Sequence, residues 1–237
     1  MPRFWSYISN EEYSAGCTGG TVYLYDKTGK ELAKFKDIPY TYHAAFSPKG
    51  DILVAKSTGG RLAVYSLEER RLIKKFRFSK IDGCQDDGYC FSPDGEKFYN
   101  IERHIESYHS ALSVYRTDDF SLEKRLFEES VIEPKEIEYD DQFGRFFVLG
   151  YFRYDEENKF FVAQLGAERL ENVVSISEIE HDFYLGYMRL AREGFTEKSR
   201  QWSLGLSYDG YDMESIEEKK HKLSNIWNYY WTKQQGY

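Results

Sequence analysis

Short apolar runs separated by turns repeat along this chain, and they are clearest between His43 and Phe76. Four runs alternate there with three turns: the first leads into Ser-Pro-Lys-Gly, and the second ends at a Gly-Gly pair. The third run, Leu62 to Tyr65, alternates strictly in side-chain character. Short runs bounded by glycine and polar residues are typical of β-strands joined by hairpins. The stretch therefore predicts a meander of four antiparallel strands.

The third strand of this unit recurs along the chain. Its pattern, apolar-x-apolar-Tyr, follows a glycine turn where it ends at Tyr25 and Tyr65 and a longer connection where it ends at Tyr115, and weaker copies end at Gln164 and Ser207. The steps between these positions are 40, 50, 49 and 43 residues. One four-stranded blade of a β-propeller takes about 40 to 50 residues, and a single blade cannot bury both of its faces. The spacing therefore predicts a propeller.

The other strands fall into the same frame and divide the chain into five units. We expect blades at about 3–37, 40–79, 86–128, 135–177 and 181–214, followed by a helix over 215–231. The helix is indicated by apolar and aromatic residues at helical spacing. The predicted fold is all-β, a single domain over 1–237 with about five four-stranded antiparallel blades and a C-terminal amphipathic helix.

Two copies of one turn carry a resemblance to a known family. Residues 46–50 read FSPKG and residues 91–95 read FSPDG, each followed by two alternating strands, and 140–144 (DDQFG) is a worn copy. Over roughly residues 40–128 the chain resembles the WD-repeat and YVTN-type β-propellers. The Trp-Asp pair and the Gly-His dipeptide of WD repeats are absent. We therefore expect a divergent propeller without the hydrogen-bond network of the WD family.

Composition and net charge indicate which kinds of partner and which cellular compartment to expect. The net charge of -8 argues against nucleic acid or an anionic membrane as partner, because both require a cationic surface. The sequence has no run of 18 apolar residues and no apolar signal-peptide core near its start. Three cysteines, Cys17, Cys84 and Cys90, are an odd number for a disulfide framework, so we expect free thiols. These features predict a cytoplasmic protein.

The chain lacks the motifs of common catalytic, cofactor and metal sites. It has no G-x-G-x-x-G, no P-loop and no G-x-S-x-G, and its Gly-Gly pairs lie between predicted strands. Its five histidines form no H-E-x-x-H, and it has no Cys-x-x-Cys. The acidic stretch 82–88 lacks the closing glutamate of a calcium loop. We expect no metal, no cofactor and no catalytic residue, and hence no enzyme activity.

Aromatic and charged residues gather in the loops that open on one face of a propeller. These loops connect second strands to third strands, and fourth strands to the next blade. Tyrosine and arginine carry much of the energy of protein interfaces. The candidate binding residues are Tyr40, Tyr42, His43, Arg61, Tyr108, His109, Arg153 and Tyr154. The predicted helix adds Trp227 and Trp231, either as a cover for the propeller or as a surface that pairs two copies in a homodimer.

The leading hypothesis is a non-enzymatic propeller that binds another protein as a scaffold or adaptor. An immunity-like protein that neutralises a bacterial toxin is one specific form of it. Two alternatives stay open. A glycan-binding propeller lectin would repeat an aromatic sugar pocket, but the four tryptophans do not recur by blade. A hydrolase or lyase would need acids that meet in the central channel, at a separation that a sequence does not reveal.

Overall fold

The computed structural model describes residues 4, 6–78, 88–103, 109–153, 159–167, 169–181 and 223–236. Sixteen strands in this part of the chain form four antiparallel sheets, each with its strands in sequence order. The first sheet comprises β1 (Ser6–Ser9), β2 (Tyr13–Cys17), β3 (Val22–Asp26) and β4 (Glu31–Phe35). The second comprises β5 (Thr41–Phe46), β6 (Ile52–Ser57), β7 (Arg61–Ser66) and β8 (Arg71–Arg77).

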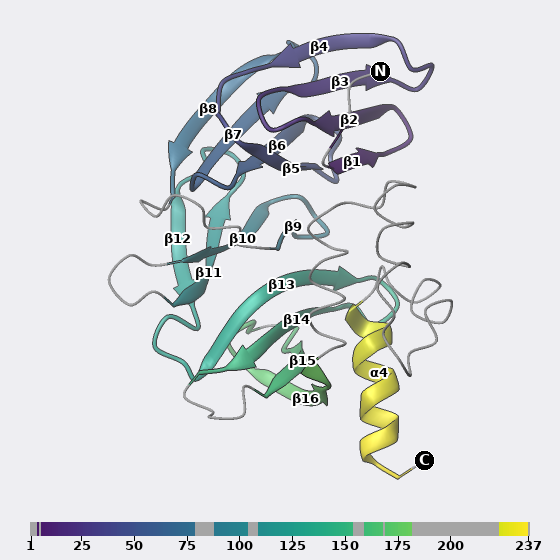
Figure 1. Ribbon diagram of the computed structural model, residues 1–237, viewed down its shortest axis with the longest axis vertical. Coiled ribbons are helices and arrows are strands. Elements are labelled where there is room, and N and C mark those ends of the chain that lie inside the picture. Colours follow the sequence, from purple (N-terminus) through teal and green to yellow (C-terminus); the bar gives the residue numbers. More distant parts are fainter. Residues whose placement is uncertain are drawn as a thin grey trace.

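The third sheet comprises β9 (Tyr89–Phe91), β10 (Lys97–Arg103), β11 (Ser110–Arg116) and β12 (Leu122–Leu126). The fourth comprises β13 (Ile132–Asp140), β14 (Arg145–Phe152), β15 (Phe160–Leu165) and β16 (Val173–Ile179). Figure 1 shows the four sheets following one another along an arc, with β1, β5, β9 and β13 on its inner side. The prediction of an all-β, propeller-like fold is confirmed for these four blades. Apart from its first residue, His181, the predicted fifth unit (181–214) lies outside the described residues.

The turn between the first two strands of a sheet repeats as the sequence predicted. Gly50, Gly95 and Gly144 take φ angles of 70°, 67° and 60°, a left-handed conformation that glycine adopts without steric cost. In the first two copies the glycine N–H donates to the serine carbonyl three residues earlier, at 3.0 and 2.9 Å. The interpretation of 140–144 as a worn copy of this turn is therefore confirmed.

The hairpin between the third and fourth strands also repeats. A register shift lies at the same place in all four sheets, and in the fourth it falls at Leu165, one residue beyond the predicted Gln164. In three sheets the third-strand tyrosine pairs with a residue of the fourth strand, and the residue two positions before that partner is left-handed: Gly29 (φ 83°), Arg70 (φ 54°) and Phe120 (φ 51°). The hairpin therefore sets this conformation whichever side chain occupies the position.

Neighbouring sheets bury apolar clusters between their faces. Between the first two sheets, the rings of Phe35 and Tyr65 stack with centroids 4.0 Å apart. A second cluster lies between the second and third sheets, and a third between the third and fourth sheets. An inner sheet is thus covered on both faces, which explains why every residue of β6 is buried.

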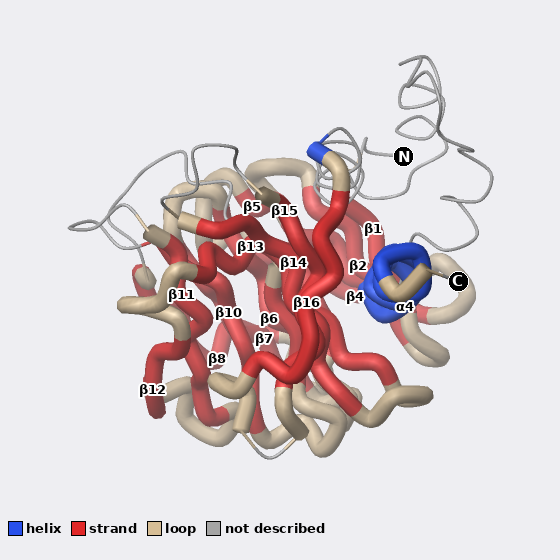
Figure 2. The backbone as a smooth tube through the Cα atoms, turned by 90° about the horizontal axis from the view of Figure 1, so that it is seen from below, coloured by secondary structure: helices blue, strands red, loops and turns tan. Residues whose placement is uncertain are grey.

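One helix, α4 (Leu223–Gln234), covers the face of the fourth sheet that is turned away from the third. Figure 2 looks along its axis while the strands are seen lengthwise, so α4 runs across them. Its buried residues pack on apolar side chains of β14, β15 and β16, and these helix residues are Leu223, Ile226, Trp227 and Tyr230. The prediction that the helix covers the propeller is confirmed, although its predicted first part, 215–222, lies outside the described residues. No helix in the described part is long and apolar enough to cross a membrane.

Candidate functional site

The loop between β4 and β5 presents an exposed aromatic ring. Tyr40 is 67% exposed, and its φ of 55° places a bulky residue in the left-handed region. Its carbonyl accepts a hydrogen bond from Thr58 N at 3.1 Å, and the carbonyl of Pro39 accepts one from Ser57 Oγ at 2.5 Å. The adjoining Thr41 pairs with Gly19 through two backbone bonds of 2.9 and 3.0 Å. Hydrogen bonds on both sides of Tyr40 therefore hold the backbone that carries this ring.

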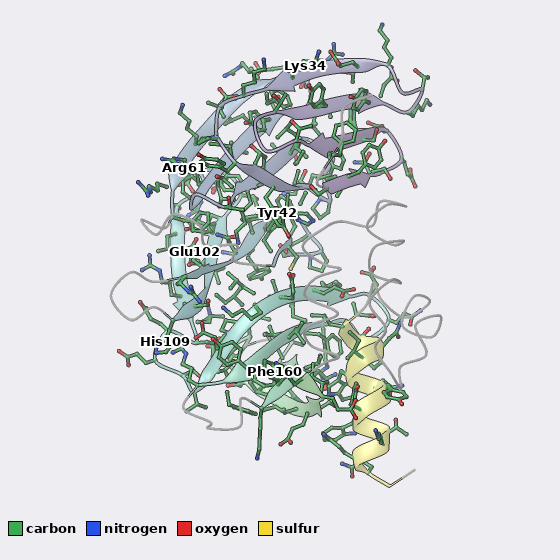
Figure 3. The ribbon with its side chains drawn as sticks, in the orientation of Figure 1. Lys34, Tyr42, Arg61, Glu102, His109 and Phe160 are labelled. Atoms are coloured by element: carbon green, nitrogen blue, oxygen red, sulfur yellow. The ribbon has the colours of Figure 1, made fainter. Side chains whose placement is uncertain are left out.

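Arg61, the first residue of β7, lies beside this ring. A methyl group added at Gly59 would lie 3.0 Å from Arg61 Nη1 and 3.8 Å from Tyr40 Cδ2, so the two side chains flank one glycine. Arg61 forms no ion pair with any residue that the structure describes. In Figure 3 it lies at the periphery of the second sheet. We call residues 36–40 and 58–61 the Tyr40 rim.

Tyr42 and His43 lie away from this rim, on the inner side of the arc. The His43 ring packs edge-on against Tyr89, with centroids 5.2 Å apart. Burial, together with the charge of Lys56, lowers the pKa of His43 to about 4. His43 and Tyr89 line a pocket of about 700 Å³ that reaches the turns 10–12 and 47–50, at the end of the sheets opposite Tyr40. His43 is therefore a neutral side chain at physiological pH.

Arg153 belongs to a buried group of charges where the third and fourth sheets meet, and the half-exposed His109 lies at the edge of this group. Glu133, which is fully buried, accepts hydrogen bonds from Ser110 N at 2.8 Å and from Arg153 Nε at 2.8 Å. Lys135 Nζ lies 3.4 Å and His109 Nδ1 3.3 Å from its carboxylate. Burial alone would raise the pKa of Glu133, but Lys135, the Ser110 N–H and Arg153 together hold it below its ordinary value. We call these five residues the Glu133 cluster.

The guanidinium of Arg153 is directed into the molecule. Besides its bond to Glu133, it donates to the carbonyls of Glu128 at 2.8 Å, Ser110 at 2.6 Å and Phe127 at 3.1 Å. The residue is only 6% exposed. The structure therefore places Arg153 in a junction between two sheets and apart from the Tyr40 rim. Tyr108 and Tyr154 lie outside the described residues.

The tryptophans of α4 face the fourth sheet. Trp227 is 9% exposed, and its ring centroid lies 5.7 Å from that of Phe147. Trp231 is half-buried and stacks on Trp227 at 5.6 Å. These two side chains fill the space between the helix and the sheet.

A second buried polar group was not predicted from the sequence. Glu102 accepts hydrogen bonds from Asn100 Nδ2 at 2.9 Å, Ser113 Oγ at 2.7 Å and Tyr115 OH at 2.5 Å. These side chains occupy the face of the third sheet that is turned toward the second. Polar side chains in alternating strands usually face solvent, and here a sheet on both sides buries them.

Two free thiols in the described part are expected to react slowly. Burial raises the pKa of Cys17 to about 12, and burial next to Glu138 also raises the pKa of Cys90. Because the thiolate is the nucleophile, both should react with Ellman's reagent at least about a hundredfold more slowly than free cysteine. The measurement uses native Cys84→Ser protein at pH 8, with denatured protein as the control. Rapid titration of two thiols in the native state would contradict the expectation.

Comparisons with known proteins support the architecture. No family model and no curated protein matches the sequence. The fold is common, since 1097 chains of solved structures match it. One of them is the hydrazine synthase of Kuenenia stuttgartiensis, with a TM-score of 0.61 at 16% identity over 76% of this chain. The match takes in 50% of that chain's length, and at such low identity it shows the propeller-like fold alone. The resemblance to the WD-repeat and YVTN-type propellers stays a prediction.

Proposed function

We propose that this protein is a non-enzymatic scaffold or adaptor that binds another protein through the Tyr40 rim. The observation that carries the proposal is the exposed ring of Tyr40 on a left-handed, hydrogen-bonded backbone. Tyrosine and arginine are enriched among the residues that dominate binding energies, and Arg61 lies beside the ring. A toxin-neutralising, immunity-like role would be one form of this function.

The backbone of Tyr40 supports a binding role for energetic reasons. A left-handed conformation costs a residue with a side chain about 1–2 kcal/mol, so neighbouring bonds must hold it in place. The bonds from Thr58 and Ser57 meet that requirement. A ring on a fixed backbone loses little conformational freedom when a partner covers it, which favours affinity.

The buried carboxylates support a role other than catalysis. Glu102 and Glu133 are enclosed between sheets, and their oxygens already accept bonds from neighbouring side chains and an N–H group. A catalytic carboxylate needs to reach a substrate or a water molecule. In the described ranges, no three histidine, cysteine or acidic side chains gather in a geometry that could hold a metal ion.

Replacing Tyr40 with glycine is expected to separate binding from stability. The change removes the ring, so capture of the partner should weaken by about thirtyfold, as for a hot-spot residue worth about 2 kcal/mol. The free energy of unfolding should change by less than about 1 kcal/mol, because relief of the left-handed strain offsets the added freedom of the unfolded chain. Quantitative affinity capture from a lysate of the source organism and urea unfolding measure the two effects.

Arg70→Gly is the matched control. Arg70 is also exposed and left-handed, but it lies in the β7–β8 turn at the opposite end of the second sheet. The change in its free energy of unfolding should be similar to that of Tyr40→Gly. Its capture of the partner should equal that of the wild type. Equal capture by wild type and Tyr40→Gly would refute the Tyr40 rim as the binding site.

A further inference from the structure

Three basic side chains share one side of the β7–β8 hairpin next to the Tyr40 rim. Arg61 lies directly opposite Arg77, and Ala63 directly opposite Lys75, in the antiparallel register. Residues directly opposite each other, and residues two apart on one strand, point to the same face of a sheet. Lys75 and Arg77 are exposed, and Arg61 is half-exposed. We call Arg61, Lys75 and Arg77 the cationic patch.

The charge of the cationic patch indicates which kind of ligand it would bind. Neither Arg61 nor Lys75 forms an ion pair with any residue in the described ranges. The chain as a whole carries a net charge of -8, so the patch has the opposite sign to the rest of the molecule. A ligand with negative charge would complement it.

Tyr40 adds an apolar surface to the same place. Its exposed ring and the Arg61 guanidinium flank Gly59. A guanidinium binds a carboxylate through two parallel hydrogen bonds, and a tyrosine ring packs against the aliphatic part of a neighbouring side chain. Together these groups match an extended peptide that carries carboxylates beside apolar atoms.

We propose that the cationic patch and Tyr40 bind an acidic segment of the partner protein, one that carries at least two aspartate or glutamate side chains. The proposal rests on the protein-binding function proposed above and specifies the chemistry of the partner. Nucleic acid fits less well, because three cations on one hairpin neutralise few phosphates and the surplus of acidic residues repels a long polyanion.

A random 12-residue peptide library displayed on phage, selected against the full chain, tests this assignment. Peptides rich in aspartate and glutamate should be enriched. A synthetic copy of an enriched peptide should bind Arg61→Glu about tenfold or more weakly than wild type, because a charge-assisted bond is replaced by repulsion. The same loss should follow when the peptide's acids become amides, and affinity should fall between 50 and 500 mM salt by roughly severalfold through screening.

Two further variants make the result decisive. Arg125→Glu makes the same charge change on exposed β12 of the third sheet and should bind the peptide like wild type. Lys75→Glu changes an exposed residue of the patch and should weaken binding in the same direction as Arg61→Glu. Melting temperatures of all three should match the wild type, since Arg61→Glu places opposite charges across the strand pair.

The outcomes also separate this assignment from the proposed function. Enriched peptides that lack acids, failure to enrich any peptide, or acidic peptides that bind Arg61→Glu unchanged would overturn the acidic segment. Tighter binding of a labelled oligonucleotide than of the peptide, lost in Arg61→Glu, would replace it with nucleic acid. Loss of partner capture in Tyr40→Gly but not in Arg61→Glu would preserve the proposed function and reject the chemistry. No change in either variant would reject both.

Discussion

Glu133→Ala is expected to lower the free energy of unfolding by about 3–5 kcal/mol, because it leaves buried cations without their counter-charge. Arg153 is 6% exposed and Lys135 5% exposed, so water does not replace the lost carboxylate. The variant also removes the acceptor of the Ser110 N–H. Urea unfolding, followed by tryptophan fluorescence and by circular dichroism, measures the change.

The pH dependence identifies the charge as the cause. The pKa of Glu133 is lower in the folded protein than its ordinary value of 4.5, so the unfolded chain takes up this proton first as pH falls. Its contribution to stability is complete above about pH 4.5 and is lost as pH falls through the lower, folded pKa. The difference between wild type and Glu133→Ala should therefore shrink in acid. The control Glu129→Ala changes an exposed residue of the β12–β13 loop that precedes Glu133 and should cost less than about 0.5 kcal/mol.

Trp227→Ala should cost about 3–5 kcal/mol, since it empties the centre of the contact between α4 and the fourth sheet. The indole packs against Phe147 and Phe143 of the sheet side and against Trp231 of the helix. Thermal and urea unfolding measure the loss. Binding of a hydrophobic dye by the variant would show that the apolar face of the fourth sheet has become accessible.

Asn228→Ala is the control on the same helix. Asn228 is exposed one position further along, and alanine is the better helix former, so its stability should stay within about 0.5 kcal/mol of wild type. If Trp227→Ala were as stable as Asn228→Ala, the helix would not be a structural cover. An aromatic face free for a partner or a second copy would then be the better interpretation of α4.

The repeated architecture was predictable because it depends on local chemistry. The glycines of residues 46–50 and 91–95 specify left-handed turns, and strict alternation in 62–65 specifies a strand. These signals lie within a few residues of each other, so no knowledge of the tertiary contacts is required. The covering face of α4 was predictable for the same reason, since helical spacing alone places Leu223 and Trp227 on one side.

The candidate site was less predictable because it depends on contacts distant in sequence. Arg153 follows a strand and was expected at the surface, but Glu133 and three backbone carbonyls draw it inside. Tyr42 and His43 were grouped with Tyr40, although Tyr42 lies on the inner side of the arc (Figure 3) and His43 packs against Tyr89 of the third sheet. The left-handed conformation of Tyr40 could not be predicted from the sequence, because the position is not occupied by glycine. It results from bonds to residues 57 and 58, which belong to the next hairpin.

The β3–β4, β7–β8 and β11–β12 hairpins have a consequence for how a chain of this kind acquires new surface chemistry. The same left-handed position holds glycine in one hairpin, arginine in the next and phenylalanine in the third, with φ between 51° and 83°. A turn held by its own strands can thus accept a large side chain at modest energetic cost, without moving its neighbours. Tyr40 likewise places a large side chain at a left-handed position, in a loop between two sheets. In these hairpins a single residue can therefore change while the fold persists, and its side chain can face solvent, as Arg70 does, or enter the core, as Phe120 does.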